Sequence, residues 1–359
     1  MSLEPASHDF LLTSLATPSP SGYEEPIQSV VRQFISPYAA AVRIDIHGNL
    51  IASSPVPLAG PRLLLAGHCD QIGMLVTHID QDGYVYAAPI GGWDPQQLVG
   101  QAMTIWTDHG PVPAVISRKP IHLLTAEERK EVVQMEQLWL DIGAADESEA
   151  RNTVKVGDCV TLDLRHRQML GRRLSGPAMD NTSGMWTVIE AFRRAVTRSE
   201  QLGCTLFSVS TVQEEIGLRG AKTAAGSINP DLAIAVDVTH ATDCPTIDKN
   251  QQGDIRLGAG PVIVHGPNMN RRVVSRLTDL ADSHQIPYQL AAIGRATPND
   301  TNVLQIHGGG VATGLVAIPN RYMHSAVEMI DLADLDHAAE LLALFALHLT
   351  AEDDFTPRV

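Results

Sequence analysis

Two histidines and several carboxylates follow apolar segments of strand length, and these residue types bind divalent metal ions. The first is His68, which ends the run Arg62–Gly67 and is followed by Asp70 in a His-x-Asp pattern. On extended backbone, residues i and i+2 share a face. His68 can therefore bind a metal ion while Asp70 fixes the tautomer of its imidazole. Taken alone, the pattern also fits a strand end with a surface histidine and a solvated aspartate.

Five further candidates lie beside other predicted elements: Asp180, Glu214, Glu215, Asp237 and His324. Asp180 precedes a predicted helix, where backbone N–H groups stabilise a carboxylate. Glu214 and Glu215 are adjacent and point in different directions, so one can bind a metal ion while the other faces a substrate. With Glu214 and Asp70 beside them, the other five side chains are two imidazoles and three carboxylates, which suit a pair of zinc or cobalt ions that share one carboxylate.

These residues need a scaffold that brings distant segments together. A hairpin is predicted over Val42–Ser53, and strands alternate with helices after Gly176. The remaining predicted strands are Thr205–Val212, Leu232–Val238 and Val311–Ile318. The predicted helices are His8–Ala16, Ser183–Val196, Gly220–Ala225, Arg271–His284 and Leu332–Leu349. A further helix is predicted to begin with a capping box at Ser21–Glu24 and to end near Phe34. This alternation indicates an α/β fold with a mostly parallel sheet flanked by helices. Ligands gather at the carboxyl ends of such strands.

Residues 71–163 show a different pattern, with short alternating segments separated by turns such as Asp80–Gly83. Strands of this length and spacing predict a small β-barrel, PDZ-like domain or sandwich inserted into the larger unit. Only Thr125–Gln137 is predicted to be helical, with Thr125–Glu128 as its cap. We therefore expect a catalytic α/β domain of residues 1–70 and 164–359, and an inserted β-barrel domain of residues 71–163.

The composition excludes some classes of partner. With 26 Lys and Arg against 41 Asp and Glu, the 359-residue chain has a formal charge of −15, which disfavours nucleic acid and anionic membranes. Its four cysteines lack C-x-x-C spacing, so neither a disulfide framework nor a thiolate zinc site is expected. The N-terminus has no signal-peptide pattern and no apolar run is long enough to cross a bilayer, so we expect a cytoplasmic protein.

Several longer motifs resemble those of the tetrahedral (TET) aminopeptidases, a family of co-catalytic zinc peptidases that includes glutamyl and deblocking aminopeptidases. They are His68–Gly73, Pro89–Asp94, Lys119–Leu124, Met179–Asn181, Gln213–Ala221, Asp237–Thr239 and Ile318–Ser325. The resemblance covers nearly the whole chain. It implies that Asp180 bridges two metal ions. His68 and Asp237 would complete the shell of one ion, and Glu215 and His324 the shell of the other.

The same resemblance implies that Glu214 is the general base and Asp70 the partner of His68. It also implies subunit contacts through the inserted β-domain and a homo-oligomer, such as a hollow dodecamer. Three departures from the family pattern are Gln71 in place of Glu, Thr182 in place of Arg, and Pro298–Thr301 in place of a Gly-Thr-Asp-Ala-like segment. None of them removes a ligand or the base, so they bear on substrate preference.

The expected function is metal-dependent removal of residues from the free N-terminus of peptides. An acyl-peptide or deblocking hydrolase on the same scaffold is the alternative. A glycoside hydrolase would also use two carboxylates, but the aromatic content is only 4% and the two histidines would have no role. A catalytically inactive assembly or binding protein would not need five ligands and a base.

Overall fold

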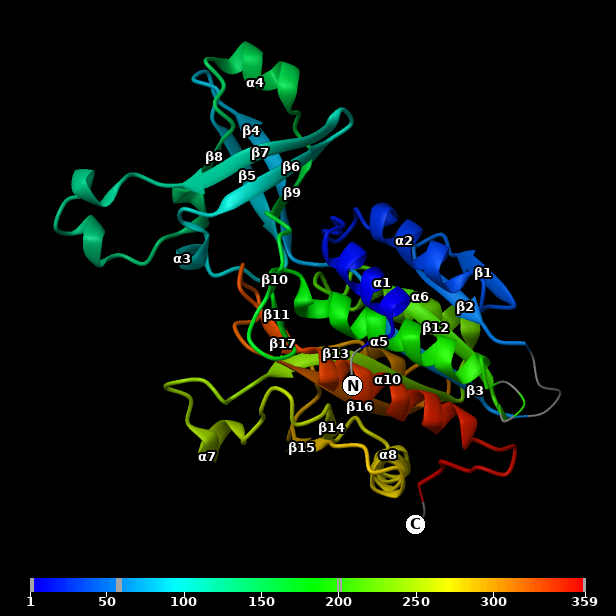
Figure 1. Ribbon diagram of the computed structural model, residues 1–359. Helices are drawn as coiled ribbons and strands as arrows, with labels where there is room; N and C mark the ends of the chain where they lie inside the picture. Colours follow the sequence, from blue (N-terminus) through cyan, green and yellow to red (C-terminus); the bar gives the residue numbers. More distant parts are fainter. Residues whose placement is uncertain (1–2, 56–59, 199, 201, 358–359) are drawn as a thin grey trace.

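A computed structural model describes residues 3–55, 60–198, 200 and 202–357 of the chain. A body of helices around a large sheet carries both ends of the chain, and a barrel of short strands projects from it (Figure 1). This arrangement confirms the predicted class, an α/β fold with an inserted β-barrel. Among the described residues, no helix is both long and apolar enough to cross a membrane.

In the described residues, the body contains a sheet of eight strands in the order β1-β2-β12-β3-β13-β16-β14-β15. The strands are β1 (Ala41–Ile44), β2 (Leu50–Ser53), β3 (Arg62–His68), β12 (Thr205–Thr211), β13 (Leu232–His240), β14 (Val262–His265), β15 (Gln289–Ala292) and β16 (Ala312–Asn320). The central strands β12, β3, β13 and β16 are parallel, so their carboxyl ends meet at one edge. Residues 63–68 of β3 are all buried, as expected for a strand covered on both faces.

The longer helices pack against this sheet. They are α1 (Pro5–Leu15), α2 (Glu25–Ile35), α5 (Met179–Val196), α6 (Arg219–Ile228), α8 (Arg271–Ser283) and α10 (Leu332–Leu347). Helix α5 contacts β3, β12 and β13 and packs against α10, whereas α6 contacts β12 and β3. A Cβ atom on Gly67 would lie only 2.7 Å from the backbone of Gly184. The glycine therefore permits α5 to approach β3 closely, which places the start of α5 beside the end of that strand.

The barrel is a closed antiparallel ring in the order β4-β5-β8-β7-β6-β9. Its strands are β4 (Gly73–Ile79), β5 (Val85–Ile90), β6 (Ala102–Thr107), β7 (Gly110–Ser117), β8 (Trp139–Asp141) and β9 (Cys159–Leu162). Alternate side chains such as Met74 and Val76 point into a small apolar core that is separate from the core of the body. The strands agree with the predicted short segments, while the domain limits 71 and 163 stay predictions.

The helix predicted over Thr125–Gln137 is wrong. This segment lies in an arm between β7 and β8 that contains only the 3₁₀ turns η1 (Ile121–Leu123), η2 (Glu128–Lys130) and η3 (Met135–Gln137). The expected cap does form, because Thr125 N donates to Glu128 Oε2 and Glu128 N donates to Thr125 Oγ1. Few of the side chains that follow are buried, and a short helix without an apolar face to bury is not stable.

The capping box predicted at Ser21–Glu24 is also wrong. Helix α2 begins at Glu25, and no side chain caps it. The hydroxyl of Ser21 instead donates to Asp70, 2.6 Å away.

Short elements without a clear sequence period were not predicted: α3 (Pro95–Leu98), α4 (Glu147–Thr153), α7 (Lys249–Gln252), α9 (Thr301–Leu304), β14, β15, and the small sheet of β10 (Arg167–Gln168), β11 (Arg173–Ser175) and β17 (Met329–Asp331).

Candidate metal centre

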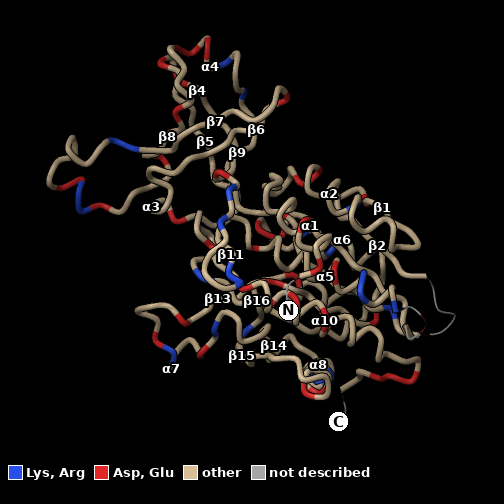
Figure 2. The backbone as a smooth tube through the Cα atoms, viewed as in Figure 1, with Lys and Arg blue, Asp and Glu red and all other residues tan. Residues whose placement is uncertain are grey.

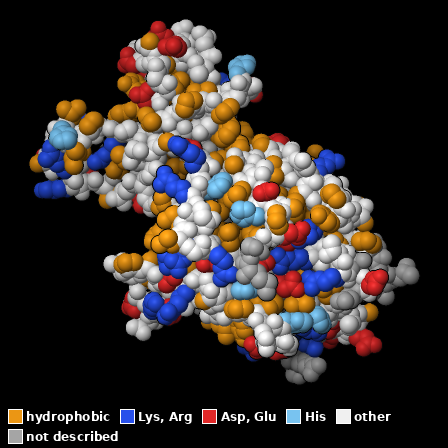
Figure 3. All heavy atoms as spheres, viewed as in Figure 1, with side chains coloured by type: hydrophobic (Ala, Val, Ile, Leu, Met, Phe, Trp, Pro, Cys, Tyr) orange, Lys and Arg blue, Asp and Glu red, His pale blue; other side chains and the backbone are white. Residues whose placement is uncertain are grey.

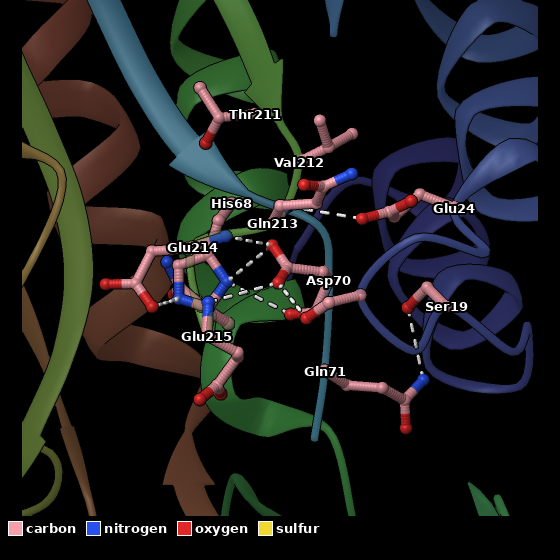
Figure 4. A network of polar contacts seen from close by, with 12 residues as sticks. Ser19, Glu24, His68, Asp70, Gln71, Thr211, Val212, Gln213, Glu214 and Glu215 are labelled. Atoms are coloured by element: carbon pink, nitrogen blue, oxygen red, sulfur yellow. Dashed lines mark hydrogen bonds and ion pairs between the residues drawn. The ribbon is translucent and has the colours of Figure 1, made fainter. Parts of the chain in front are cut away.

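The predicted site residues gather at the carboxyl edge of the parallel strands. His68 ends β3 and pairs in register with Thr211, the last residue of β12. Glu214 and Glu215 follow β12 after a short turn and lie beside His68 (Figure 4). Asp237 lies on the neighbouring strand β13. The parallel pairing of these strands is therefore what brings the segments together.

His68, Glu214 and Asp237 form one group of candidate ligands, with one donor atom from each within 4.8 Å of the others. His68 Nε2 lies 3.8 Å from Glu214 Oε2 and 3.7 Å from Asp237 Oδ1. The imidazole is buried, with 3% of its side chain exposed. An imidazole and two carboxylates at this spacing can surround a single divalent cation.

Asp180, Glu215 and His324 form a second group. His324 Nε2 lies 3.2 Å from Asp180 Oδ2 and 3.5 Å from Glu215 Oε1. The other oxygen of Asp180, Oδ1, lies 3.4 Å from His68 Nε2. Asp180 therefore joins the two groups, with one carboxylate oxygen facing each imidazole.

The site has features that suit bound cations. Among the described residues, Asp180 Oδ1 and Glu215 Oε1 are buried without a hydrogen-bond partner. Such oxygens are costly to bury unless they bind a cation or a donor. The acids of the two groups pair with His68 and His324, and an imidazole must be neutral to bind metal. The imidazole and carboxylate donors present therefore fit a pair of cations of the zinc or cobalt type.

The crowded acids shift the protonation of the site. Burial raises the pKa of Glu214 well above its usual value, and burial also raises the pKa of Glu215. Asp180 is buried as well, but its contacts with His324 and His68 lower its pKa. Contacts with Asp180 and Glu215 raise the pKa of His324 to about 11. Burial opposes the charged form of His68, yet the surrounding acids, Glu214 foremost, raise its pKa well above the usual value.

Asp70 is fully buried and supports the first group. Its carboxylate accepts hydrogen bonds from Glu214 N at 3.0 Å and Glu215 N at 3.2 Å (Figure 4). It also accepts one from Ser21 Oγ at 2.6 Å. Its Oδ1 lies 3.4 Å from His68 Nδ1, whereas its main-chain oxygen is nearer to that nitrogen, at 3.0 Å. Asp70 thus holds the backbone of both glutamates as well as facing the imidazole.

Glu328 supports the second group, and no pattern in the sequence pointed to it. Its side chain is buried, and Oε2 accepts from Asp180 N at 2.8 Å while Oε1 accepts from His324 N at 2.7 Å. Burial, assisted by the charge of Asp180, raises the pKa of Glu328 to about 8. One carboxylate therefore fixes two backbone segments that are far apart in the sequence.

The barrel also contributes to the site. His324 Nδ1 donates to the main-chain oxygen of Gly92, 2.8 Å away, in the segment between β5 and α3. This bond leaves Nε2 free to face Asp180. A Cβ atom on Gly91, where φ is +77°, would lie 2.6 Å from Ile72 Cγ2 and 3.3 Å from Glu215 Oε2. The glycines therefore let the barrel segment approach the candidate ligands.

The structure brings together every predicted site residue: His68, Asp70, Asp180, Glu214, Glu215, Asp237 and His324. Four nearby residues were missed: Ser21, Glu24, Asp300 and Glu328. Asp300 belongs to the segment Pro298–Thr301, a noted departure from the family pattern. Its Oδ2 accepts from Thr211 Oγ1 at 2.7 Å, and burial raises its pKa to about 7. Asp300 follows no strand and begins only a one-turn helix, so no periodic signal marked it.

The chain resembles known proteins along most of its length. Residues 48–341 match the family model described as M42 glutamyl aminopeptidase. The lysyl aminopeptidase of Pyrococcus furiosus is 35% identical over 351 residues, which are 96% of this chain and 97% of that protein.

Solved structures agree with this match. A TET aminopeptidase from the marine sediment archaeon Thaumarchaeota archaeon SCGC AB-539-E09 has a TM-score of 0.91 and 32% identity, with 96% of each chain covered. The TET1 peptidase of Pyrococcus horikoshii has a TM-score of 0.84 and 30% identity, covering 96% of this chain and all of that one. The resemblance inferred from the motifs is thereby confirmed. The chain is an aminopeptidase and belongs to the M42 glutamyl aminopeptidase family.

Proposed function

We propose that this aminopeptidase acts with two divalent cations, zinc or cobalt, bound at the two groups, with Glu214 of the first group serving as a base and not as a ligand. Asp180 would bridge the cations, His68 and Asp237 would complete one shell, and Glu215 and His324 the other. The observation that carries the proposal is the position of the Asp180 carboxylate between the two groups. One of its oxygens lies 3.4 Å from the imidazole of His68, and the other lies 3.2 Å from that of His324. The buried Oδ1 of Asp180 and Oε1 of Glu215, which accept no hydrogen bond, support it.

Glu214 is the proposed general base. When bound, the cations would polarise the scissile carbonyl and make a water molecule more acidic. Glu214 would accept a proton from the attacking water and then donate it to the nitrogen of the leaving amine. The second step needs the protonated carboxyl, and burial favours that form by raising the pKa of Glu214. Asp70 would keep this residue in place through the main-chain N–H.

Peptides with a free N-terminus are the proposed substrates. Acidic positions gather in the body below the barrel, near α1 and α5 (Figure 2). At the candidate site, the charges of Asp237 and Asp300 add to the effect of burial in raising the pKa of Glu214, and the charge of Asp237 adds to it in raising the pKa of Asp300. Carboxylates that exceed the charge of the bound cations would attract an α-ammonium group. An acetylated N-terminus lacks this charge.

The chain is also proposed to self-associate into a homo-oligomer, such as a dodecamer, through the barrel. The arm between β7 and β8 exposes apolar side chains (Figure 3), among them Ile121, Leu123 and Val132, which are 60%, 66% and 58% exposed. The solved PhTET1 structure holds a dodecamer, and the P. horikoshii TET1 peptidase can assemble into a tetrahedron or a large octahedral shell. Light scattering would test for a mass of twelve times the 38.7 kDa chain.

The test of function removes all metal and reloads the protein with zinc or cobalt. Hydrolysis is then compared for the nitroanilides of leucine, glutamate and lysine, each with a free and with an acetylated amino group. We expect cleavage only after reloading, and only of the free amines. Cleavage of acetylated compounds alone would contradict the proposed substrate class and indicate a deblocking hydrolase. Full activity in the stripped protein would contradict the role of the cations.

A further inference from the structure

The segment Ser19–Glu24 lies against the loops that follow β3 and β12 (Figure 4). Gln71 N donates to Ser19 O at 2.9 Å, and Gln71 Nε2 donates to Ser19 Oγ at 3.1 Å. Ser21 Oγ donates to Asp70 at 2.6 Å. The N-terminal part of the chain therefore packs directly behind the candidate metal centre.

Within this segment, Glu24 makes the contact nearest to the proposed base. Its side chain is buried, and one oxygen, Oε1, accepts from Gly22 N at 2.8 Å and from Gln213 N at 3.2 Å. Gln213 directly precedes Glu214 and has a φ of +54°. A residue with a side chain adopts this left-handed conformation only at a cost. The acceptor supplied by Glu24 helps to offset that cost by satisfying the N–H of the strained residue.

Two buried carboxylates thus hold three consecutive N–H groups. Glu24 accepts from Gln213, and Asp70 accepts from Glu214 and Glu215. Together they fix the turn that ends β12 and hence the direction in which the side chain of Glu214 leaves the backbone. Geometry of this kind matters, because a shift of about 1 Å in a catalytic group can reduce the rate about 100-fold.

We propose that Glu24 is a positioning residue for Glu214, and that it acts by holding the main-chain N–H of Gln213. This inference rests on the proposed function in one respect, the assignment of Glu214 as the base. Ser21 and Glu24 have the spacing of a capping box, but neither caps α2. Both side chains instead contact the residues that surround the metal centre.

Two substitutions separate the reach of Glu24 from its charge. Glu24→Gln keeps an oxygen at the place where both N–H groups donate, but removes the charge. Glu24→Asp keeps the charge, but the shorter side chain withdraws the acceptor. Burial raises the pKa of Glu24 to about 7, so a neutral side chain is a close substitute near neutral pH. Glu25→Gln, at an exposed neighbouring carboxylate, is the matched control.

The experiment measures kcat and KM of the metal-loaded variants, their metal content, and the visible spectrum of the cobalt-loaded forms. We expect Glu24→Asp to lower kcat about 10- to 100-fold with KM unchanged, and Glu24→Gln to stay within about threefold of the wild type. Metal content and cobalt spectra should match the wild type in every variant. In a Glu214→Gln background, Glu24→Asp should lower the residual kcat by less than about threefold, because residues that act as a unit are not additive.

Four results would overturn the role of Glu24 alone: wild-type kcat in Glu24→Asp, equal losses in Glu24→Gln and Glu24→Asp, loss of metal from Glu24→Asp, or an undiminished effect of Glu24→Asp in the Glu214→Gln background. The equal losses would indicate a role for charge, and the loss of metal would indicate a role in ligand geometry. An unchanged kcat in Glu214→Gln itself would overturn the base assignment and, with it, this inference. The single Glu214→Gln variant therefore distinguishes the two failures.

Discussion

The two ligand groups are built in different ways. His68 and Asp237 lie on parallel strands, and the side chain of His68 is only 3% exposed. Glu214 follows the last residue of β12 by three positions, and its main-chain N–H donates to Asp70. Asp180, Glu215 and His324 come from a helix start, a turn and a loop, and the side chain of His324 is 32% exposed. The first group is located mainly by the sheet. The second depends on individual contacts, above all those of Glu328 and Gly92.

This difference indicates unequal rigidity. His68 and Asp237 lie in parallel strands and pair in register with a neighbouring strand, His68 with Thr211 and Asp237 with Ala317, so neither position rests on one contact. A residue in a loop keeps its position only as long as its own few contacts persist. We therefore expect the cation of the second group to be the more easily lost, and to respond more strongly to changes in supporting residues.

The largest effect is expected for Glu214→Gln, which removes the proposed base from the rigid group. Loss of a general base lowers kcat about 10²- to 10⁴-fold. The amide is isosteric, so the fold and both cations should be retained. Steady-state kinetics combined with metal analysis measures the change. A variant that keeps more than about a tenth of the wild-type kcat would show that Glu214 is not the base.

The next largest effect, on metal affinity, is expected for variants of the two supporting acids, Glu328 and Asp70. Glu328→Gln leaves one acceptor for two main-chain N–H groups, so the backbone at Asp180 or His324 must shift. Loss of such outer contacts costs about 10- to 100-fold in metal affinity. Cobalt titration, followed by visible absorbance, should show a larger loss for the weaker of the two cations.

Asp70→Asn is the matched comparison, because Asp70 faces His68 from the first group and holds the main-chain N–H of Glu215 from the second. We expect this variant to weaken both cations by similar factors. Equal losses of both cations in Glu328→Gln, or a selective loss in Asp70→Asn, would contradict the division into a rigid group and a dependent one.

The same difference between the two ligand groups explains how much of the site could be predicted from the sequence. His68 and Asp237 end apolar runs, and parallel strands bring such ends together, so their proximity follows from pattern alone. His324 and Asp180 were candidates because they lie after a predicted strand and before a predicted helix, but their roles came from motif resemblance, because a loop and a helix start have no period that predicts which ligands they face. Glu328 was missed since it stands in an irregular segment and acts through main-chain atoms, which leave no trace in residue spacing.

The wrong capping box at Ser21–Glu24 and the wrong helix after Thr125–Glu128 have a common physical reason. Ser21 and Glu24 have capping-box spacing, but Ser21 donates to the buried Asp70 and Glu24 accepts from the main-chain N–H of Gln213 instead. Thr125 and Glu128 do form their reciprocal bonds, but no helix follows because the segment has little apolar surface to bury. Local spacing therefore identifies residues that can bond to one another, while tertiary contacts decide which bonds form.

A smaller effect is expected where the barrel approaches the second group. In Gly91→Ala, the new Cβ would lie 2.6 Å from Ile72 Cγ2 in a backbone with φ of +77°. Alanine in this conformation costs about 1–2 kcal/mol before any clash. We expect a lower melting temperature and weaker binding of the cation held by Glu215 and His324, measured by calorimetry and cobalt titration.

Gly92→Ala is the control, because its Cβ would lie 3.5 Å from His324 Nδ1, an ordinary contact, and its φ is not in the left-handed region. This variant should behave as the wild type. Weakening by Gly92→Ala but not by Gly91→Ala would show that the approach of the barrel is not limited at Gly91.

The smallest effect on activity is expected for a substitution of Asp334. Like Glu328, Asp334 is a carboxylate that holds two main-chain N–H groups, but it lies away from the site. This buried carboxylate accepts from Gly258 N and Gly260 N, both at 2.7 Å. Burial raises its pKa to about 7, above the value of about 4 in an unfolded chain. The folded protein therefore holds an extra proton between those values, so the stability contributed by Asp334 is complete below about pH 4 and is lost as the pH rises through 7.

Asp334→Asn removes this titration, and its free energy of unfolding can be compared with that of the wild type by urea denaturation of both metal-free proteins from pH 5 to 8. The wild type should gain stability over the variant as the pH falls, with a slope of at most about 1.4 kcal/mol per pH unit. The kcat of the metal-loaded variant should stay within about twofold, because Asp334 holds glycines that contact no candidate ligand. A stability difference that is flat, or that grows with rising pH, would mean that Asp334 remains charged. A large loss of kcat would mean that the carboxylates supporting the site extend beyond Asp70 and Glu328.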